Sequence, residues 1–171
     1  MKNPKSVELL NKAIAEEELA LHQYMYFHFV LDDMGYDVLA NIFKRIAIEE
    51  MRHVEAFAER ILFLGGDVEL GKLPRPIEKI HDPKEMLEWA MQSESEAIDM
   101  YSQWAIEVVQ TDRDLGTEQL FKKVVMDEER HFEIFETEFL NLQKFGDQYL
   151  AQQAMERSRR MGANPTGEQN L

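Results

Sequence analysis

The sequence predicts an all-α protein, a bundle of four long helices followed by a short fifth helix. Three observations predict it. Apolar residues recur at helical spacing over four long runs. The 8 glycines and 5 prolines gather at the ends of these runs and between them. A chain of 171 residues can bury one sizeable core, so we expect a single domain over residues 1–171.

Each helix has start or stop residues of its own. Asn3 and Pro4 supply an N-cap and a first-turn proline for the first helix. The segment 32–37, DDMGYD, separates it from the second, which ends before Gly65 and Gly66. The expected helices cover residues 4–31, 37–64, 83–109, 115–144 and 147–160.

The second half of the chain repeats this pattern. Asp82 and Pro83 begin the third helix. The segment 111–116, TDRDLG, separates the third helix from the fourth, and Gly146 follows the fourth. After the short fifth helix, the last residues, GANPTGEQNL, are expected to be frayed.

The connection between the second and third helices predicts the topology. Its roughly 16 residues reach about 50 Å when extended. A helix of about 27 residues is roughly 40 Å long. The connection can therefore cross the whole bundle and join two antiparallel hairpins.

Charge and composition exclude several classes of function. The chain has 33 acidic and 19 basic residues, for a net charge of -14, which disfavours nucleic acid and anionic lipid as partners. It has no cysteine, so any metal must be held by oxygen and nitrogen. No run is long and apolar enough to span a bilayer, and the first residues do not form a signal peptide. We expect a cytoplasmic protein.

Two Glu-x-x-His motifs lie on predicted helices. Glu50 and His53 are in the second helix, and Glu128 and His131 are in the fourth. Residues three apart lie on the same helix face, so each pair can grip one ion. The motif alone is weak evidence, because the string also occurs at residues 78–81, in the proline-bearing connection.

A second motif strengthens the prediction. Glu17 and Tyr24 in the first helix recur with the same spacing as Glu94 and Tyr101 in the third. All four glutamates lie roughly a dozen residues into their helices, so they converge near the middle of the bundle. A Glu from each of two helices and a Glu-x-x-His pair from each of the other two form the ligand set of di-iron and di-manganese carboxylate bundles.

Four buried carboxylates need positive charge among them. Two divalent cations supply it, and four carboxylates with two imidazoles suit iron or manganese better than calcium or zinc. The alternative is that these six residues are partly solvated polar residues of the bundle and bind no redox metal. The predicted metal ligands are Glu17, Glu50, His53, Glu94, Glu128 and His131.

The chain resembles the bacterioferritins, a ferritin-like family, over nearly its whole length. The segments that carry the resemblance are EELALHQY, IEEMRHVEAFAERILFLGG and DEERHFEIFETEFL. The resemblance implies a ferritin-like fold with the long crossover. It also implies that Glu17 and His53 hold one iron and Glu94 and His131 the other, with Glu50 and Glu128 bridging them.

The resemblance also implies a function. The six ligands would be catalytic in a ferroxidase, which oxidises Fe(II) to Fe(III) with O2 or H2O2. The mineral would be stored in a shell of 24 identical subunits, giving iron storage and detoxification. Two alternatives remain open: a rubrerythrin-like di-iron peroxidase and a non-redox structural bundle.

The resemblance also implies a haem site at Met51. It lies about 100° around the helix from Glu50, so it points away from the metal ligands. In bacterioferritins the methionine at this position, one from each of two subunits, ligates a haem iron across a twofold interface. The expected cofactors are therefore iron and one haem per pair of subunits.

Overall fold

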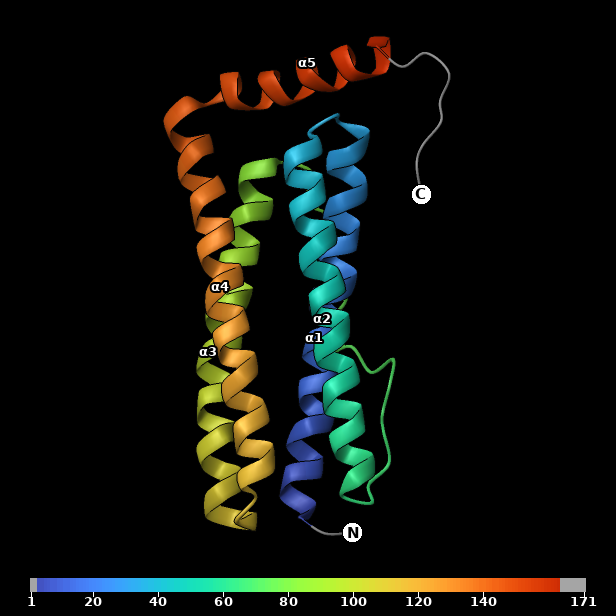
Figure 1. Cartoon of the computed structure of the whole chain (residues 1–171), viewed down its shortest axis with the longest axis vertical. Helices are drawn as coiled ribbons and strands as arrows, with labels where there is room; N and C mark the ends of the chain where they lie inside the picture. The colour runs from blue at the N-terminus through green and yellow to red at the C-terminus, as the bar shows by residue number, and fades with distance from the viewer. Residues whose placement is uncertain (1–2, 164–171) are drawn as a thin grey trace.

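The computed structural model describes residues 3–163, and within this range every regular element is an α-helix. Figure 1 shows four long helices side by side and a shorter helix across one end. The predicted all-α bundle is confirmed. The helices are α1 (Pro4–Asp33), α2 (Asp37–Phe63), α3 (Pro83–Asp112), α4 (Leu115–Phe145) and α5 (Asp147–Ala163).

The helices form two antiparallel hairpins, α1 with α2 and α3 with α4. Residues 64–82 contain no helix and carry the chain back along the bundle, so α3 starts at the end where α2 starts (Figure 1). This is the expected long crossover, which the length of the connection permitted. No helix of the described part has the length and apolar character needed to cross a membrane.

Four helices end later than expected, because the sequence breaks are shorter than the turn residues indicated; α4, for example, ends at Phe145 instead of residue 144. α1 continues to Asp33 instead of residue 31, and Gly35 then takes a positive φ of 80°. α3 continues to Asp112 instead of residue 109. It ends at Arg113, which is left-handed with φ 55°.

α1 begins at Pro4, as expected, with Asn3 as its N-cap residue. Asn3 is left-handed, with φ 57°, and its side chain makes no capping hydrogen bond. Instead, Asp112 Oδ2 accepts a hydrogen bond from the backbone N–H of Ser6 at 2.8 Å. The last residue of α3 therefore satisfies a free donor at the first turn of α1.

The ends of α2 and α5 also differ from the expected ends. α2 ends at Phe63, one residue early, because Leu64 is its C-cap and Gly65 follows with a positive φ of 73°. α5 runs to Ala163, so the first two residues of the expected frayed tail are helical. The rest of that tail, residues 164–171, lies outside the described residues.

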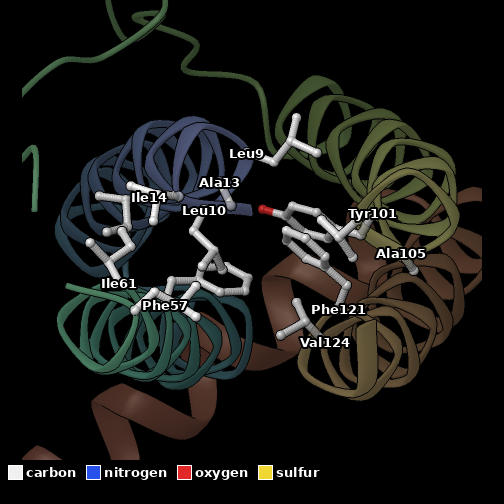
Figure 2. Packing of buried hydrophobic residues seen from close by; sticks show 13 residues of the cluster. Leu9, Leu10, Ala13, Ile14, Phe57, Ile61, Tyr101, Ala105, Phe121 and Val124 are labelled. Carbon is white, nitrogen blue, oxygen red and sulfur yellow. The ribbon is translucent and has the colours of Figure 1, made fainter. Parts of the chain in front are cut away.

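The hydrophobic core has two parts, one on each side of a polar layer at mid-bundle. The first includes Leu10, Phe57 and Phe121, which meet between the four helices in Figure 2. The second includes Phe27 and Phe43. Because apolar residues close both sides, the polar layer lies in a low-dielectric interior, where charges interact strongly.

α5 packs on the open end of the bundle. Gln153 Oε1 accepts hydrogen bonds from the N–H groups of Val38 and Leu39, at 3.2 and 3.4 Å. Arg157 forms an ion pair with Asp37 at 3.0 Å. The fifth helix thus supplies acceptors that the first turn of α2 lacks within its own sequence.

Candidate metal centre

Six ionisable side chains meet in the polar layer, and all are buried, with at most 7% of each residue exposed. They form two groups, in each of which one atom from every member lies within 4.8 Å of the others. The structure therefore brings together all six residues that the sequence predicted. The first group is Glu17, Glu50, His53 and Glu128, and the second is Glu50, Glu94, Glu128 and His131.

The first group centres on Nδ1 of His53. This atom lies 2.9 Å from Glu50 Oε2, 3.2 Å from Glu17 Oε2 and 3.3 Å from Glu128 Oε1. Both Glu50 and His53 come from one face of α2, since they are three residues apart. Glu17 reaches them from α1 and Glu128 from α4.

The second group centres on Nδ1 of His131. This atom lies 3.0 Å from Glu128 Oε2, 3.1 Å from Glu50 Oε1 and 3.8 Å from Glu94 Oε2. Glu50 and Glu128, the carboxylates of the two Glu-x-x-His pairs, thus each direct one oxygen to His53 and the other to His131. The glutamates of α1 and α3 each face one imidazole only.

Glu50 and Glu128, which belong to both groups, each have one carboxylate oxygen that accepts no hydrogen bond. Glu50 Oε1 and Glu128 Oε1 are buried and accept no hydrogen bond, although each lies near an imidazole nitrogen. An unsatisfied buried carboxylate oxygen costs free energy. A cation at each group would supply the missing partner, so the donor set fits two divalent ions.

Two buried tyrosines cross between the hairpins. The hydroxyl of Tyr24 on α1 donates to Glu94 on α3, and the hydroxyl of Tyr101 on α3 donates to Glu17 on α1. Each bond fixes the orientation of a carboxylate that faces only one imidazole. The sequence predicted that these tyrosines share the helix faces of the glutamates, but not that the bonds cross.

Two further carboxylates hold the outer nitrogens of the imidazoles. Glu49 Oε2 lies 3.0 Å from Nε2 of His131, and Asp127 Oδ2 lies 3.4 Å from Nε2 of His53. Arg130 binds both acids, at 2.6 Å to Glu49 and 3.1 Å to Asp127. A carboxylate on the far nitrogen fixes the tautomer of a ligating imidazole and increases its basicity.

Sequence reasoning did not assign Glu49 and Asp127 to the imidazoles. A signal for them does exist, because each acid directly precedes the glutamate of a Glu-x-x-His motif. Burial raises the pKa of Glu49, but hydrogen bonds from Arg130 and His131 outweigh burial and lower the pKa to about 2. Glu49 is therefore ionised at neutral pH.

Burial and mutual repulsion hold protons in the polar layer. Burial, with the charge of Glu94, raises the pKa of Glu50 to about 7. Burial, with the charge of Glu128, raises the pKa of Glu94 to about 8. Burial lowers the pKa of His53, but the carboxylates of Glu128, Glu17 and Glu50 around its Nδ1 outweigh burial and raise this pKa well above its usual value. Without cations, protons thus offset part of the negative charge.

Met51 lies outside this centre. It is on α2, beside Glu50 in sequence, and half of it is exposed. Its side chain therefore belongs to the surface of the bundle, as its position on the helix predicted. Met51 belongs to neither group of candidate ligands.

The fold and the cluster together define a class of protein: a ferritin-like bundle whose buried carboxylates and imidazoles are suited to holding two cations. Comparisons with known proteins agree. The family model described as "Ferritin-like domain" matches residues 7–145. The bacterioferritin of Desulfovibrio desulfuricans is 40% identical over 147 residues, which are 86% of this chain and 81% of that protein. The bacterioferritin of Brucella melitensis is 33% identical over 87% of this chain and 91% of that protein. The chain belongs to the bacterioferritins.

Solved structures give the same family. The D. desulfuricans bacterioferritin, described with its diiron site in different catalytic states, superposes with a TM-score of 0.85 and 38% identity. The match covers 89% of this chain and 88% of that one. The Rhodobacter capsulatus bacterioferritin, described with a metal-free dinuclear site and a haem iron, superposes with a TM-score of 0.82 and 31% identity. That match covers 88% of this chain and 94% of the other.

Proposed function

We propose that this chain is the subunit of an iron-storage protein that oxidises Fe(II) to Fe(III) at a di-iron site within each subunit. One observation carries the proposal. Glu50 and Glu128 each turn one oxygen to His53 and the other to His131, and the Oε1 atom of each is buried and accepts no hydrogen bond. In a protein that used these residues only for stability, protons would offset this cost only in part.

The proposed ligands have distinct roles. Glu17 and His53 hold one iron, and Glu94 and His131 hold the other. Glu50 and Glu128 bridge the two ions. Tyr24 and Tyr101 hold the outer glutamates in place, and the apolar residues on both sides limit access of water.

The chemistry follows from charge. Each Fe(II) gives up one electron, and four carboxylates stabilise the more positive Fe(III) product. The two electrons, with two protons, reduce one O2 to H2O2 or one H2O2 to two waters. We propose that either molecule serves as the oxidant. Oxygen consumed per iron oxidised distinguishes the two.

Membership of the family supports a proposal for assembly and haem binding. We propose a shell of 24 copies built from pairs of subunits, with one haem held between the Met51 residues of each pair. The exposure of Met51 supports this, since an axial ligand must reach beyond its own bundle. A cytoplasmic location stays a prediction.

The test is aerobic addition of Fe(II) while near-ultraviolet ferric absorbance is followed. The wild type should show a fast phase, and Glu50→Ala should lose it. Glu55→Ala is the matched control, because Glu55 is an exposed acid on the same helix. Equal fast phases in the wild type and Glu50→Ala would contradict the ferroxidase proposal.

A further inference from the structure

A hollow of about 130 Å³ leads from the surface between α1 and α3 to the metal centre. Its inner wall includes the four proposed glutamate ligands, and its outer part includes Glu16 and Glu96. Arg75 of the crossover is the one basic residue among the described residues that line it. A guanidinium therefore lies at the mouth of a passage lined by carboxylates.

The crossover is fixed to α1 on both sides of Arg75. Glu18 Oε2 accepts a hydrogen bond from the backbone N–H of Gly71 at 2.7 Å. The buried Gln23 side chain donates to the carbonyl of Glu78 at 2.8 Å and accepts from its N–H at 2.7 Å. In Figure 2 the crossover, a thin green tube, runs along the outside of α1. Residues between these two anchors form an arch.

Trp89 sets where the arginine rests. The guanidinium carbon of Arg75 lies 5.8 Å from the centre of the indole ring, a cation–π contact. The indole N–H donates to Glu78 Oε1 at 2.9 Å, so the ring is tied to the same segment. Arg75 is exposed, so its guanidinium can leave this contact without moving the crossover.

We propose that Arg75 is a gate: a divalent cation displaces its guanidinium from the mouth to enter, and its return delays escape of the ion. This rests on the function proposed above. Arg75 controls entry and exit of the ion and is not a ligand, because it does not belong to either group of candidate ligands. Its charge acts on an ion in the passage more than on an ion held deeper by three carboxylates and an imidazole.

The kinetic consequence is specific. A positive charge at the mouth raises the barrier for entry and exit alike. Removing it should therefore increase both the association and the dissociation rate, with a smaller change in Kd. A charge that only attracted or repelled ions from afar would change the association rate alone.

The probe is Co(II), which is bound without oxidation under anaerobic conditions, with the assembled full-length protein. Association is followed by visible absorbance in a stopped-flow instrument, and dissociation by adding excess EDTA. Arg75→Gln should increase both rates roughly 3- to 10-fold at low ionic strength. The difference should shrink at about 0.5 M salt, where screening is strong. Kd should change by less than about 2-fold.

Lys72→Gln is the matched control. It removes the same charge from the same arch, but Lys72 does not line the hollow and pairs with Glu69 at 2.7 Å. Its rates should equal those of the wild type. Arg75→Lys keeps the charge and should stay within about 3-fold of the wild type.

Three outcomes would overturn the gate: unchanged rates in Arg75→Gln, the same rates in Arg75→Gln and Lys72→Gln, or a faster association with unchanged dissociation. Failure of the proposed function looks different. In that case Glu50→Ala would bind Co(II) as the wild type does, whatever residue 75 is.

Discussion

Nε2 of His131 lies 3.0 Å from Oε2 of Glu49, on the opposite side of the imidazole from the nitrogen that faces the metal centre. His53 has the same arrangement with Asp127, at the longer distance of 3.4 Å. Both imidazoles are thus held from outside by a carboxylate of the other hairpin. The unequal distances lead to the first prediction.

Glu49→Gln should weaken binding of the Co(II) ion next to His131 by roughly 10- to 100-fold, because the imidazole of His131 loses its ionised outer partner. Asp127→Asn should weaken the other ion less, since its contact is longer and the side chain more exposed. Calorimetric titration with Co(II) measures both. Glu55→Gln, on the exposed face of α2, is the control. Two variants with unchanged affinity would show that the outer carboxylates do not tune the imidazoles.

Tyr101→Phe should lower the free energy of unfolding of the metal-free protein by about 1 to 3 kcal/mol, because Glu17 loses a buried donor. Tyr24→Phe should cost a similar amount through Glu94. Urea denaturation measures the change. The control is Tyr26→Phe, whose hydroxyl lies 3.0 Å from Nε2 of His81 near the surface. A cost in the control as large as in the buried pair would refute the role assigned to the crossed bonds.

The metal-free protein should become less stable as pH rises from about 5 to 8. The pKa values of Glu50 and Glu94, about 7 and 8 in the folded chain against 4.5 ordinarily, mean that the folded state binds more protons over this range. The stability contributed by such raised groups is complete below about 4.5 and is lost as pH rises through the folded values. Glu49, with its pKa lowered to about 2, titrates below this range and adds no slope.

Bound cations replace those protons, so the increase in Tm caused by Zn(II) should grow from pH 5 to pH 8. Differential scanning calorimetry at several pH values, with and without Zn(II), measures it. A Glu50→Gln, Glu94→Gln double variant should have a flatter slope without metal. A metal-free protein that gains stability over this range would contradict the raised pKa values.

Met51→Leu should abolish the Soret band of protein reconstituted with haem, because leucine offers no axial ligand. Met126→Leu on α4 is the control, since Met126 is also exposed, at 70%. Visible spectra of the two variants at equal protein concentration decide the matter. A Soret band retained in Met51→Leu would exclude this methionine as the axial ligand.

The bundle and the six clustered residues were predictable because helical periodicity and motif spacing are local properties of the sequence. The outer partners were not. Glu49 and Asp127 lie about 100° around their helices from the neighbouring glutamates, so their contacts depend on how α2 and α4 are rotated against each other. The cap that Asp112 gives to α1 joins residues 106 positions apart.

Arg75 was beyond prediction for another reason. The crossover has no periodicity, and its course depends on hydrogen bonds between its backbone and the side chains of Glu18, which accepts, and Gln23, which donates and accepts. These hydrogen bonds involve backbone groups of the crossover, so no side-chain pattern in the crossover predicts them. Only the folded arrangement places the arginine beside the hollow.

The crossed tyrosine bonds make each hairpin depend on the other. Tyr24 serves the glutamate of the second hairpin, and Tyr101 serves the glutamate of the first. Glu49 and Asp127 likewise each contact the imidazole of the other hairpin. Two identical copies of one such hairpin, related by a twofold axis, would therefore already assemble a complete centre for two ions. Each hairpin supplies only three of the six candidate ligands, so neither half of the chain forms the whole centre by itself.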